Sequence, residues 1–249
     1  MPRLSVIIIA KNEAANIGAC LDSVAFADER IVVDSQSNDA TAEIAAQKGA
    51  RVVARKFDGF GSQKNFALTL AQGDWVLSID ADERVSPALK QAIETAISRA
   101  AAEAYEFPRL SSFCGRQMRH SGWFPDHVLR LFRRGRARFS DDIVHERVIC
   151  DGAVARLDEP LDHAPVIRLE DALSRMDRYS TAGAEMLVAK GRRVWFMSGI
   201  VHGLWTFLRT YFLKAGFLDG REGFLLAVAN AEGTYYRYMK TWLARRRLD

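Results

Sequence analysis

The stretch WVLSIDADERVSPALK, residues 75–90, changes character in its middle. Its first half is an apolar run, typical of a strand buried on both faces of a sheet. Three acids follow within four residues, Asp80, Asp82 and Glu83, although carboxylates this close repel one another. A Ser-Pro pair at 86–87 then has the residue types preferred at the cap and first position of a helix. The stretch therefore predicts a buried strand, an acidic turn and a helix.

The same succession of strand and helix fills the first hundred residues. Apolar, β-branched runs predict strands at 4–10, 30–34, 50–55 and 75–80. Helical spacing of apolar residues predicts helices near 17–24, 40–48 and 62–72, and again from 87. We expect Asn12 to cap the first of these helices. The pattern predicts an α/β fold with a doubly wound, mostly parallel sheet, in which ligands bind beyond the carboxyl ends of the strands.

The second half of the chain has a different pattern. Residues 104–168 contain short extended segments, which predict an antiparallel region that completes the sheet and covers the site. From residue 169 onward the chain reads as helical. We therefore expect one domain at 1–168, with halves at 1–103 and 104–168, and a helical extension at 169–249.

Composition and charge restrict the classes of protein. With 249 residues, 49% hydrophobic and 27% charged, the chain has enough apolar residues for a sizeable core. Its three cysteines are widely spaced and form no CxxC pair, which indicates free thiols in a reducing compartment. No signal peptide is evident at the N-terminus, so we expect a cytoplasmic protein.

The positive charge lies in two zones. Residues 108–138 carry 8 Arg against one acid, and residues 189–249 carry 11 Lys or Arg against 4 acids. Such zones indicate an anionic partner. Neither contains a recognised nucleic-acid module, so we expect no nucleic acid and favour an anionic lipid surface or a phosphorylated acceptor.

The run VWFMSGIVHGLWTFLRTYFLKAGFL, residues 194–218, has two interpretations. It is either a buried pair of helices or an interfacial helix lying on a membrane, because basic residues flank it and aromatic residues punctuate it. Its apolar core, 194–208, is too short and too interrupted for a membrane span.

Asp80-Ala81-Asp82 is the first candidate for chemistry. At the end of a strand, residues i and i+2 point the same way, so both carboxylates face one small volume. Such a pair suits Mg²⁺ or Mn²⁺, whose shells are completed by water and substrate phosphates. The alternative is an acidic turn before a helix.

Asp34 similarly ends the second strand, where it either binds a base or ribose or forms a turn. Lys64 either approaches a phosphate or is a surface lysine.

Taken together, three segments resemble the successive motifs of inverting family-two glycosyltransferases of the GT-A fold: SVIIIAKNEAANIGACLDSV (5–24), IVVDSQSNDATAEIA (31–45) and GFGSQKNFALTLAQGDWVLSIDADE (59–83). Four later segments resemble the lipopolysaccharide-core β-glycosyltransferases that add glucose to inner-core heptose: WFPDHVLRLFRR (123–134), DDIVHERV (141–148), RYSTAGAEM (178–186) and YFLKAGFLDGREGF (211–224). The resemblance implies a UDP-sugar donor, a divalent cation and a phosphorylated, lipid-linked saccharide acceptor. It also implies a peripheral position on the anionic cytoplasmic face of the inner membrane.

Carried over position by position, the resemblance makes 1–103 the nucleotide-sugar half and 104–168 the acceptor half. It implies a set of donor-binding residues: Ala10, Asn12, Glu13, Asp34, Lys64, Asp80, Ala81 and Asp82. Within this set Asp34 contacts the uracil, and Lys64 approaches the base or diphosphate. Asp82 is the more direct metal ligand, Asp80 lies beside it, and Glu83 is a bystander in the turn. Gln36 departs from the family, which often has glycine there.

Inverting transfer needs a base for the acceptor hydroxyl and stabilisation of the leaving diphosphate. The family's HE motif matches at 145–146, which favours Glu146 as the base, with Asp142 second and His145 orienting the base or the acceptor. The alternative is a charged loop without a catalytic role. Arg130 and Arg133 alternate with apolar residues in a strand-like run and present the planar fork that suits phosphate, unless they only line a solvated face.

Trp123 either stacks on an acceptor sugar or packs in the protein.

Two other functions compete with sugar transfer to the lipopolysaccharide core. A nucleotidyltransferase shares the architecture and paired acids, but the loop after the first strand reads AKNEAANIG and lacks a Gly-rich, basic phosphate loop. A non-catalytic, membrane-associated nucleotide-binding protein is the other. A glycosyltransferase for another envelope polysaccharide or lipid is a further alternative.

Overall fold

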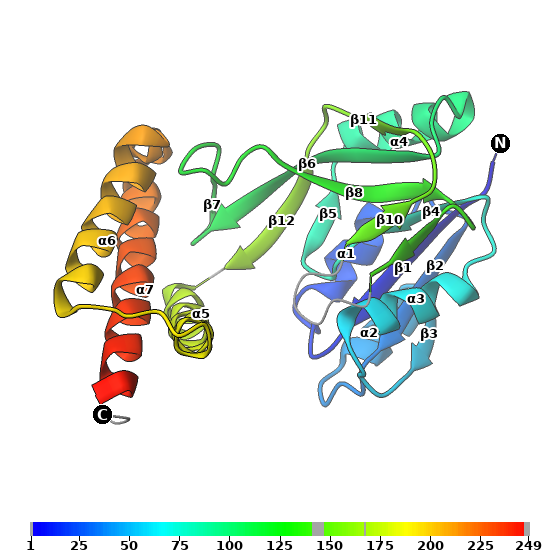
Figure 1. Ribbon diagram of the computed structural model, residues 1–249. Helices are drawn as coiled ribbons and strands as arrows, with labels where there is room; N and C mark the ends of the chain where they lie inside the picture. Colours follow the sequence, from blue (N-terminus) through cyan, green and yellow to red (C-terminus); the bar gives the residue numbers. More distant parts are fainter. Residues whose placement is uncertain (1, 141–146, 167, 247–249) are drawn as a thin grey trace. The chain divides into compact units, whose positions relative to one another are not determined.

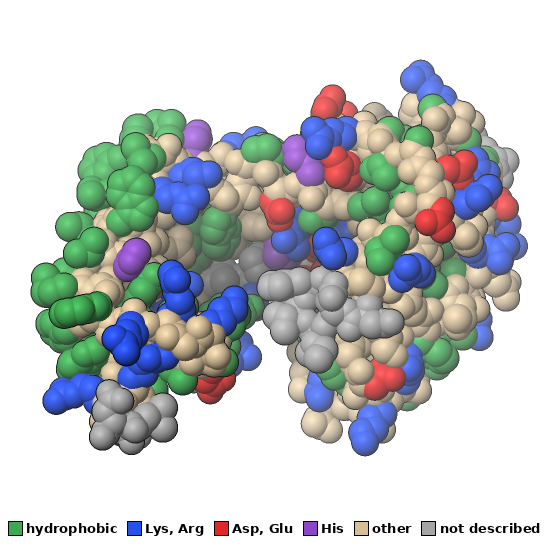
Figure 2. Space-filling model, in the orientation of Figure 1, with side chains coloured by type: hydrophobic (Ala, Val, Ile, Leu, Met, Phe, Trp, Pro, Cys, Tyr) green, Lys and Arg blue, Asp and Glu red, His purple; other side chains and the backbone are tan. Residues whose placement is uncertain are grey.

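The computed structural model describes residues 2–140, 147–166 and 168–246 (Figure 1), and Figure 2 shows the side chains in the same orientation. Contacts divide the chain into two compact units. The first unit comprises Met1–Arg109 and Asp126–His163, and the second comprises Leu110–Pro125 and Ala164–Asp249.

The first unit begins with a parallel sheet of the predicted strands. These are β1 (Leu4–Ala10), β2 (Glu29–Asp34), β3 (Arg51–Ala54) and β4 (Trp75–Ser78), hydrogen-bonded in the order β3-β2-β1-β4. The intervening helices are α1 (Ile17–Ser23), α2 (Thr41–Gln47) and α3 (Phe60–Leu70), and α4 (Pro87–Arg99) follows the last strand. Because β1 and β2 pair in parallel with Ala10 opposite Asp34, their carboxyl ends meet at one edge.

Beyond β4 the sheet continues with antiparallel strands, as the sequence predicts. β8 (Asp126–Arg133) pairs antiparallel with β4 on one side and with β6 (Ala104–Phe113) on the other. β12 (Leu161–Val166) follows β6 in the sheet and pairs antiparallel with β5 (Glu83–Val85). Three shorter strands lie in this unit: β9 (Ala137–Phe139) and β10 (Val148–Cys150), which pair with each other as a separate sheet, and β11 (Val154–Arg156), which pairs with β6. β7 (Arg116–Gln117) belongs to the second unit.

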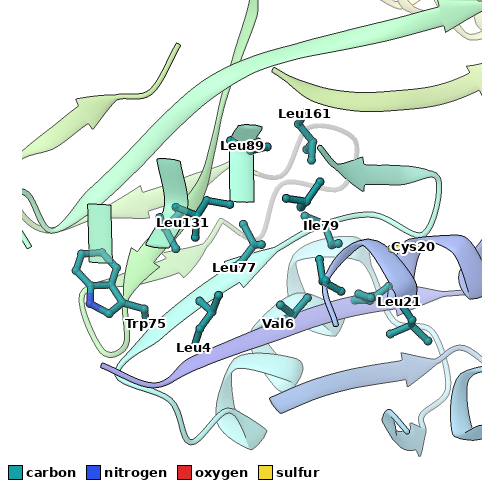
Figure 3. Packing of buried hydrophobic residues seen from close by; sticks show 14 of the residues in the cluster. Leu4, Val6, Cys20, Leu21, Trp75, Leu77, Ile79, Leu89, Leu131 and Leu161 are labelled. Atoms are coloured by element: carbon teal, nitrogen blue, oxygen red, sulfur yellow. The ribbon is translucent and has the colours of Figure 1, made fainter. Parts of the chain in front are cut away.

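The core lies on both faces of the parallel strands because their β-branched side chains point alternately to either face. Val6 and Ile8 of β1 belong to a buried cluster with Leu21 of α1 and Leu89 of α4. Figure 3 shows part of this cluster, with Val6 and Leu77 on neighbouring strands and Cys20 and Leu21 on α1. Ile7, between Val6 and Ile8, instead packs with residues of α3 in a second cluster.

Two details differ from the sequence prediction. Asn12 does not cap α1: the helix begins after Asn16, and Asn12 has a left-handed backbone with φ 56°. Its side-chain oxygen instead accepts a hydrogen bond from the backbone N–H of Asn38 at 2.8 Å. The sequence also gave no indication of β5, in which Glu83 begins a short strand rather than a solvated turn.

The second unit contains the helical extension. Its helices are α5 (Leu169–Ala189), α6 (Phe196–Leu208) and α7 (Gly220–Arg246), with a π-helical turn η1 (Arg209–Leu213) and a 3-10 turn η2 (Gly216–Asp219) between the last two. α7 packs against both α5 and α6. Asp219 is buried and accepts hydrogen bonds from the backbone N–H groups of Arg119 and His120 and from the hydroxyl of Ser121. Among the described helices, none is both long enough and apolar enough to cross a membrane.

The start of α4 confirms the predicted cap. The Ser86 hydroxyl accepts a hydrogen bond from the Leu89 N–H at 3.1 Å, and Pro87 occupies the first position of the helix. We expect Ser86→Ala to lower the free energy of unfolding by about 1 kcal/mol, because the orphan N–H loses its partner. Urea denaturation measures this loss. The control is Ser98→Ala in the same helix, which we expect to change stability by less than about 0.5 kcal/mol. Equal effects of the two changes would contradict the capping role.

Candidate functional site

The candidate site lies at the carboxyl edge of the parallel strands. The carbonyl of Ala10, at the end of β1, accepts a hydrogen bond from the N–H of Ser35 at 2.8 Å. Asp34, at the end of β2, is 4% exposed, and its two carboxylate oxygens accept hydrogen bonds from the N–H and hydroxyl of Ser37. The edge is therefore held together by the turn after β2.

This turn also binds the loop after β1. The N–H of Asn12 donates to the Ser37 hydroxyl at 2.9 Å, and the N–H of Glu13 donates to the Thr41 hydroxyl at 2.8 Å. The structure thus brings together the predicted residues at the ends of β1 and β2. Gln36 has φ 59°, a left-handed backbone that glycine adopts without strain, which explains why glycine suits this position.

Asp80 follows β4 and lies between two cations. One carboxylate oxygen is 3.0 Å from Lys64 Nζ, and the other accepts a hydrogen bond from Arg130 Nη2 at 2.6 Å. Lys64 and Arg130 are both buried, at 3% and 6% exposure. Burial raises the pKa of Asp80, but the charges of Arg130 and Lys64 outweigh it and hold that pKa far below its ordinary value. Asp80 is therefore a carboxylate whose charge is already compensated.

Glu83 is the residue of this edge whose place sequence reasoning missed. It was expected to be a bystander, but its side chain is completely buried. Its Oε1 accepts a hydrogen bond from Arg130 Nη2 at 2.7 Å, and its Oε2 accepts one from the Asp80 N–H at 2.9 Å. Burial raises the pKa of Glu83, and the neighbouring Asp80 carboxylate raises it further, while Arg130 lowers it. Glu83 and Arg130 together fix the backbone and side chain of Asp80.

Asp82 has a different neighbour. Its Oδ2 is 3.4 Å from Nε2 of His163, which β12 carries opposite Glu83 of β5. Burial raises the pKa of Asp82, but the hydrogen bond and charge of His163 lower it, and the net shift is downward. Ala81, between the two aspartates, is buried, and its carbonyl accepts a hydrogen bond from Arg84 at 2.8 Å. The two aspartates of the motif therefore lie in separate environments.

The chemistry of Asp82 and His163 fits a divalent cation. Within residues 2–140, 147–166 and 168–246, no three His, Cys, Asp or Glu side chains form a metal cluster. The carboxylate oxygen and imidazole nitrogen lie 3.4 Å apart, close to the roughly 3 Å between neighbouring ligands of an octahedral cation. The pair therefore suits a site that water and substrate phosphates complete.

The remaining predicted residues lie elsewhere. Arg133 is at the opposite end of β4 from Asp80, where it pairs with Trp75 in the sheet and with Glu103 in an ion pair of 3.1 Å. Trp123 belongs to the second unit, where its ring packs edge-on against Phe113. The proposed bases and their neighbour lie outside the described residues: Asp142, His145 and Glu146.

Comparison with known proteins identifies the class. The sequence profile of the family described as glycosyl transferase family 2 matches residues 5–157. An uncharacterized glycosyltransferase of Rickettsia felis is 30% identical over 96% of this chain and 89% of its own. The lipopolysaccharide core biosynthesis glycosyltransferase LpsC of Rhizobium meliloti is 31% identical over 92% of this chain and 87% of its own.

A solved structure of glucosyl-3-phosphoglycerate synthase from Mycobacterium tuberculosis, in complex with Mn²⁺, UDP-glucose and phosphoglyceric acid, is 28% identical over 43% of each chain, with a TM-score of 0.39. The family match covers more than half of the chain, and the two relatives extend over most of it. The chain is therefore a glycosyltransferase of family 2. Its GT-A fold, with a helical C-terminal extension, is the fold that the sequence predicts.

We expect the ion pairs of Arg130 with Asp80 and Glu83 to stabilise the folded protein. We expect Arg130→Met to lower the free energy of unfolding by about 3 kcal/mol, because it leaves two carboxylates without their shared cation. The double variant Arg130→Met/Glu83→Gln should recover part of this loss, since the buried glutamate charge is also removed. Urea unfolding followed by tryptophan fluorescence measures both.

Arg133→Met is the matched control on the same strand. Its side chain is 39% exposed, so loss of its ion pair should cost less than about 1 kcal/mol. A loss at Arg133 as large as the loss at Arg130, or no recovery in the double variant, would show that the ion pairs of Arg130 do not stabilise this edge.

Proposed function

We propose that the chain is a metal-dependent, inverting glycosyltransferase that moves glucose from UDP-glucose to a hydroxyl of inner-core heptose in lipopolysaccharide. One observation carries the proposal: two aspartates in separate charge environments, Asp80 and Asp82, lie at the carboxyl edge of the sheet in a chain of glycosyl transferase family 2. This edge is where α/β sheets of this kind bind ligands. The similarity to LpsC supports the lipopolysaccharide core as the acceptor.

The donor is assigned to the residues that meet at this edge. In the proposal Ala10, Asn12, Glu13 and Asp34 hold the nucleoside, and Ala81 lies against it. Lys64 forms an ion pair with Asp80, and in the proposal its positive charge lies beside the diphosphate. Arg130 was predicted to bind acceptor phosphate, but its contacts with Asp80 and Glu83 favour a positioning role in the donor site.

Asp82 is the proposed metal ligand, with His163 beside it and Asp80 as a neighbour rather than the main ligand. A bound Mg²⁺ or Mn²⁺ would act as a Lewis acid that stabilises the departing UDP. Asp82 and His163 would hold that cation, and Lys64 would add a fixed positive charge beside the diphosphate.

The acceptor side of the reaction rests on the sequence resemblance. We propose Glu146 as the base that removes the proton from the acceptor hydroxyl, with Asp142 as the second choice. His145, Arg133 and Trp123 stay proposals for acceptor binding. The acceptor itself is proposed to be a phosphorylated, lipid-linked saccharide, so the protein would work peripherally at the cytoplasmic face of the inner membrane.

A nucleotidyltransferase is the main alternative, and the product released from the donor distinguishes the two reactions. Sugar transfer from UDP-glucose releases UDP, whereas nucleotidyl transfer releases pyrophosphate. Membership of glycosyl transferase family 2 favours the first. An acceptor from another envelope polysaccharide or lipid is tested by replacing lipopolysaccharide core with that acceptor in the same assay. Slow hydrolysis of UDP-glucose without acceptor would count against a binding protein that lacks catalysis.

The metal role is tested by Asp82→Ala. We expect transfer to fall at least about a hundredfold, because the diphosphate loses the cation that stabilises it. We also expect the rise in melting temperature caused by UDP with Mn²⁺ to disappear, since only ligands that bind the native state raise its stability. The control Asp22→Ala changes a carboxylate that is 60% exposed, and should keep both properties. Full activity of Asp82→Ala, or of the wild type in excess chelator, would refute metal dependence.

The base is tested separately by Glu146→Gln. We expect this variant to retain the thermal shift with UDP and Mn²⁺ but to lose transfer by about a hundredfold or more, because the amide accepts no proton. Asp142→Asn is the comparison, and should retain more activity than Glu146→Gln. Persistent turnover in Glu146→Gln with loss in Asp142→Asn would move the base to Asp142.

A further inference from the structure

Helix α6 exposes many of its large apolar side chains and buries its glycines, whereas an ordinary surface helix exposes polar residues. The side of α6 that contacts α7 carries glycines: a Cβ added at Gly199 would lie 2.6 Å from Met239, and one at Gly203 would lie 3.2 Å from the carbonyl of Ala231. Both glycines are buried. Small residues four apart let two helices approach closely, a mode of packing frequent between helices in lipid. Gly199 and Gly203 therefore let α6 approach α7 closely. Phe196, His202 and Phe207 pack against aromatic side chains of α7 beside this contact, and the strongly exposed apolar side chains of α6 lie away from it.

These outward side chains form what we call the α6 face. With Trp195 just before the helix and Leu213 of η1 included, its members are Trp195, Met197, Val201, Leu204, Trp205 and Leu213, whose exposed fractions are 79%, 57%, 59%, 59%, 53% and 68%. Figure 2 shows hydrophobic side chains, in green, gathered over α6 at the left of the view. From residue 194 to residue 208 the sequence contains no Asp, Glu, Lys or Arg.

Exposure of such an apolar surface to water is unfavourable. A helix on the surface of a soluble protein turns its polar residues outward, and contiguous apolar patches of this kind mark a place of interaction. The exposed side chains are large aliphatic and aromatic groups, whose removal from water is favourable. The α6 face therefore needs a partner that is itself apolar.

The charges around the face indicate which partner. Lys190, Arg192 and Arg193 precede α6, and Arg209, Lys214 and Arg221 follow it. All six residues are exposed, and none forms an ion pair within the described part of the chain. A second copy of the chain, docked through the same face about a two-fold axis, would bring these basic rims toward each other. An anionic lipid surface instead complements them, at about 1 kcal/mol for each Lys or Arg near the headgroups.

We propose that the α6 face lies in the headgroup region of an anionic bilayer, parallel to its plane, with these basic residues among the phosphates. The 13 residues of α6 extend about 20 Å, which is short of a bilayer core of about 30 Å, so the helix does not span it. Interfacial helices bury their apolar face about 5–10 Å deep, and aromatic residues such as Trp195 and Trp205 are favoured at that depth. This surface gives the membrane contact of the proposed function a location, although binding to lipid does not require sugar transfer.

The test is binding of the full chain to phospholipid vesicles. We expect co-sedimentation with vesicles of phosphatidylcholine mixed with phosphatidylglycerol, and much weaker binding to phosphatidylcholine alone. Acyl chains brominated near the headgroup should quench the tryptophan fluorescence of the bound protein. Leu204→Glu/Trp205→Glu should lower the partition coefficient at least about tenfold, because it places two charges in the apolar layer. Arg192→Gln/Arg193→Gln should lower binding to the anionic vesicles about fivefold for each charge removed.

Controls separate lipid binding from misfolding and from catalysis. Val154→Glu introduces a charge at an apolar side chain of the first unit that is 46% exposed, and should bind vesicles like the wild type. Circular dichroism should be the same for every variant. Asp82→Ala should also bind vesicles normally, so failure of the proposed enzyme function leaves this result intact.

Three outcomes would overturn the proposal. One is a wild-type chain that stays in the supernatant with both kinds of vesicle. Another is equal binding to neutral and anionic vesicles, which would remove the role of the basic rim. The third is a dimer in light scattering that Leu204→Glu/Trp205→Glu converts to a monomer, which would make a second copy the occupant of the α6 face.

Discussion

The site depends on one buried guanidinium, Arg130, which contacts Asp80 and Glu83 at 2.6 and 2.7 Å. Arg130 lies on β8, the first antiparallel strand beside the parallel half of the sheet, so its ion pairs join the two halves where the acidic turn begins. Removing two carboxylates from water costs several kcal/mol for each unless a partner compensates them. Arg130 supplies that partner for Asp80 and Glu83, while the third acid, Asp82, faces His163.

Features set by neighbouring residues were predictable from the sequence. The strands of the parallel sheet follow from apolar runs, and the start of α4 follows from Ser86 and Pro87, because periodicity and capping are local properties. The role of Glu83 was not predictable, since its partner Arg130 is 47 residues away and reaches it only through strand pairing. Asn12 was assigned to the wrong partner for a related reason: its side chain meets a backbone group 26 residues away.

The second unit shows a similar limit. The apolar run at 194–218 predicts helix, but its composition is the same whether the large side chains face a neighbouring helix or lie exposed. The decision rests on Gly199 and Gly203, which contact α7 and so place the strongly exposed apolar side chains away from it. Gly199 and Gly203 are four residues apart in the sequence, but only the pairing with α7 shows which face they occupy.

The two aspartates of the motif illustrate how environment separates identical side chains. Each oxygen of Asp80 already faces a positive group, Lys64 on one side and Arg130 on the other. A divalent cation placed there would meet two like charges at close range, which costs free energy. Asp82 faces the imidazole of His163, a nitrogen donor that metals accept. In the proposed reaction, the cation would therefore lie next to Asp82, and Asp80 with its two partners would form the fixed wall of the site.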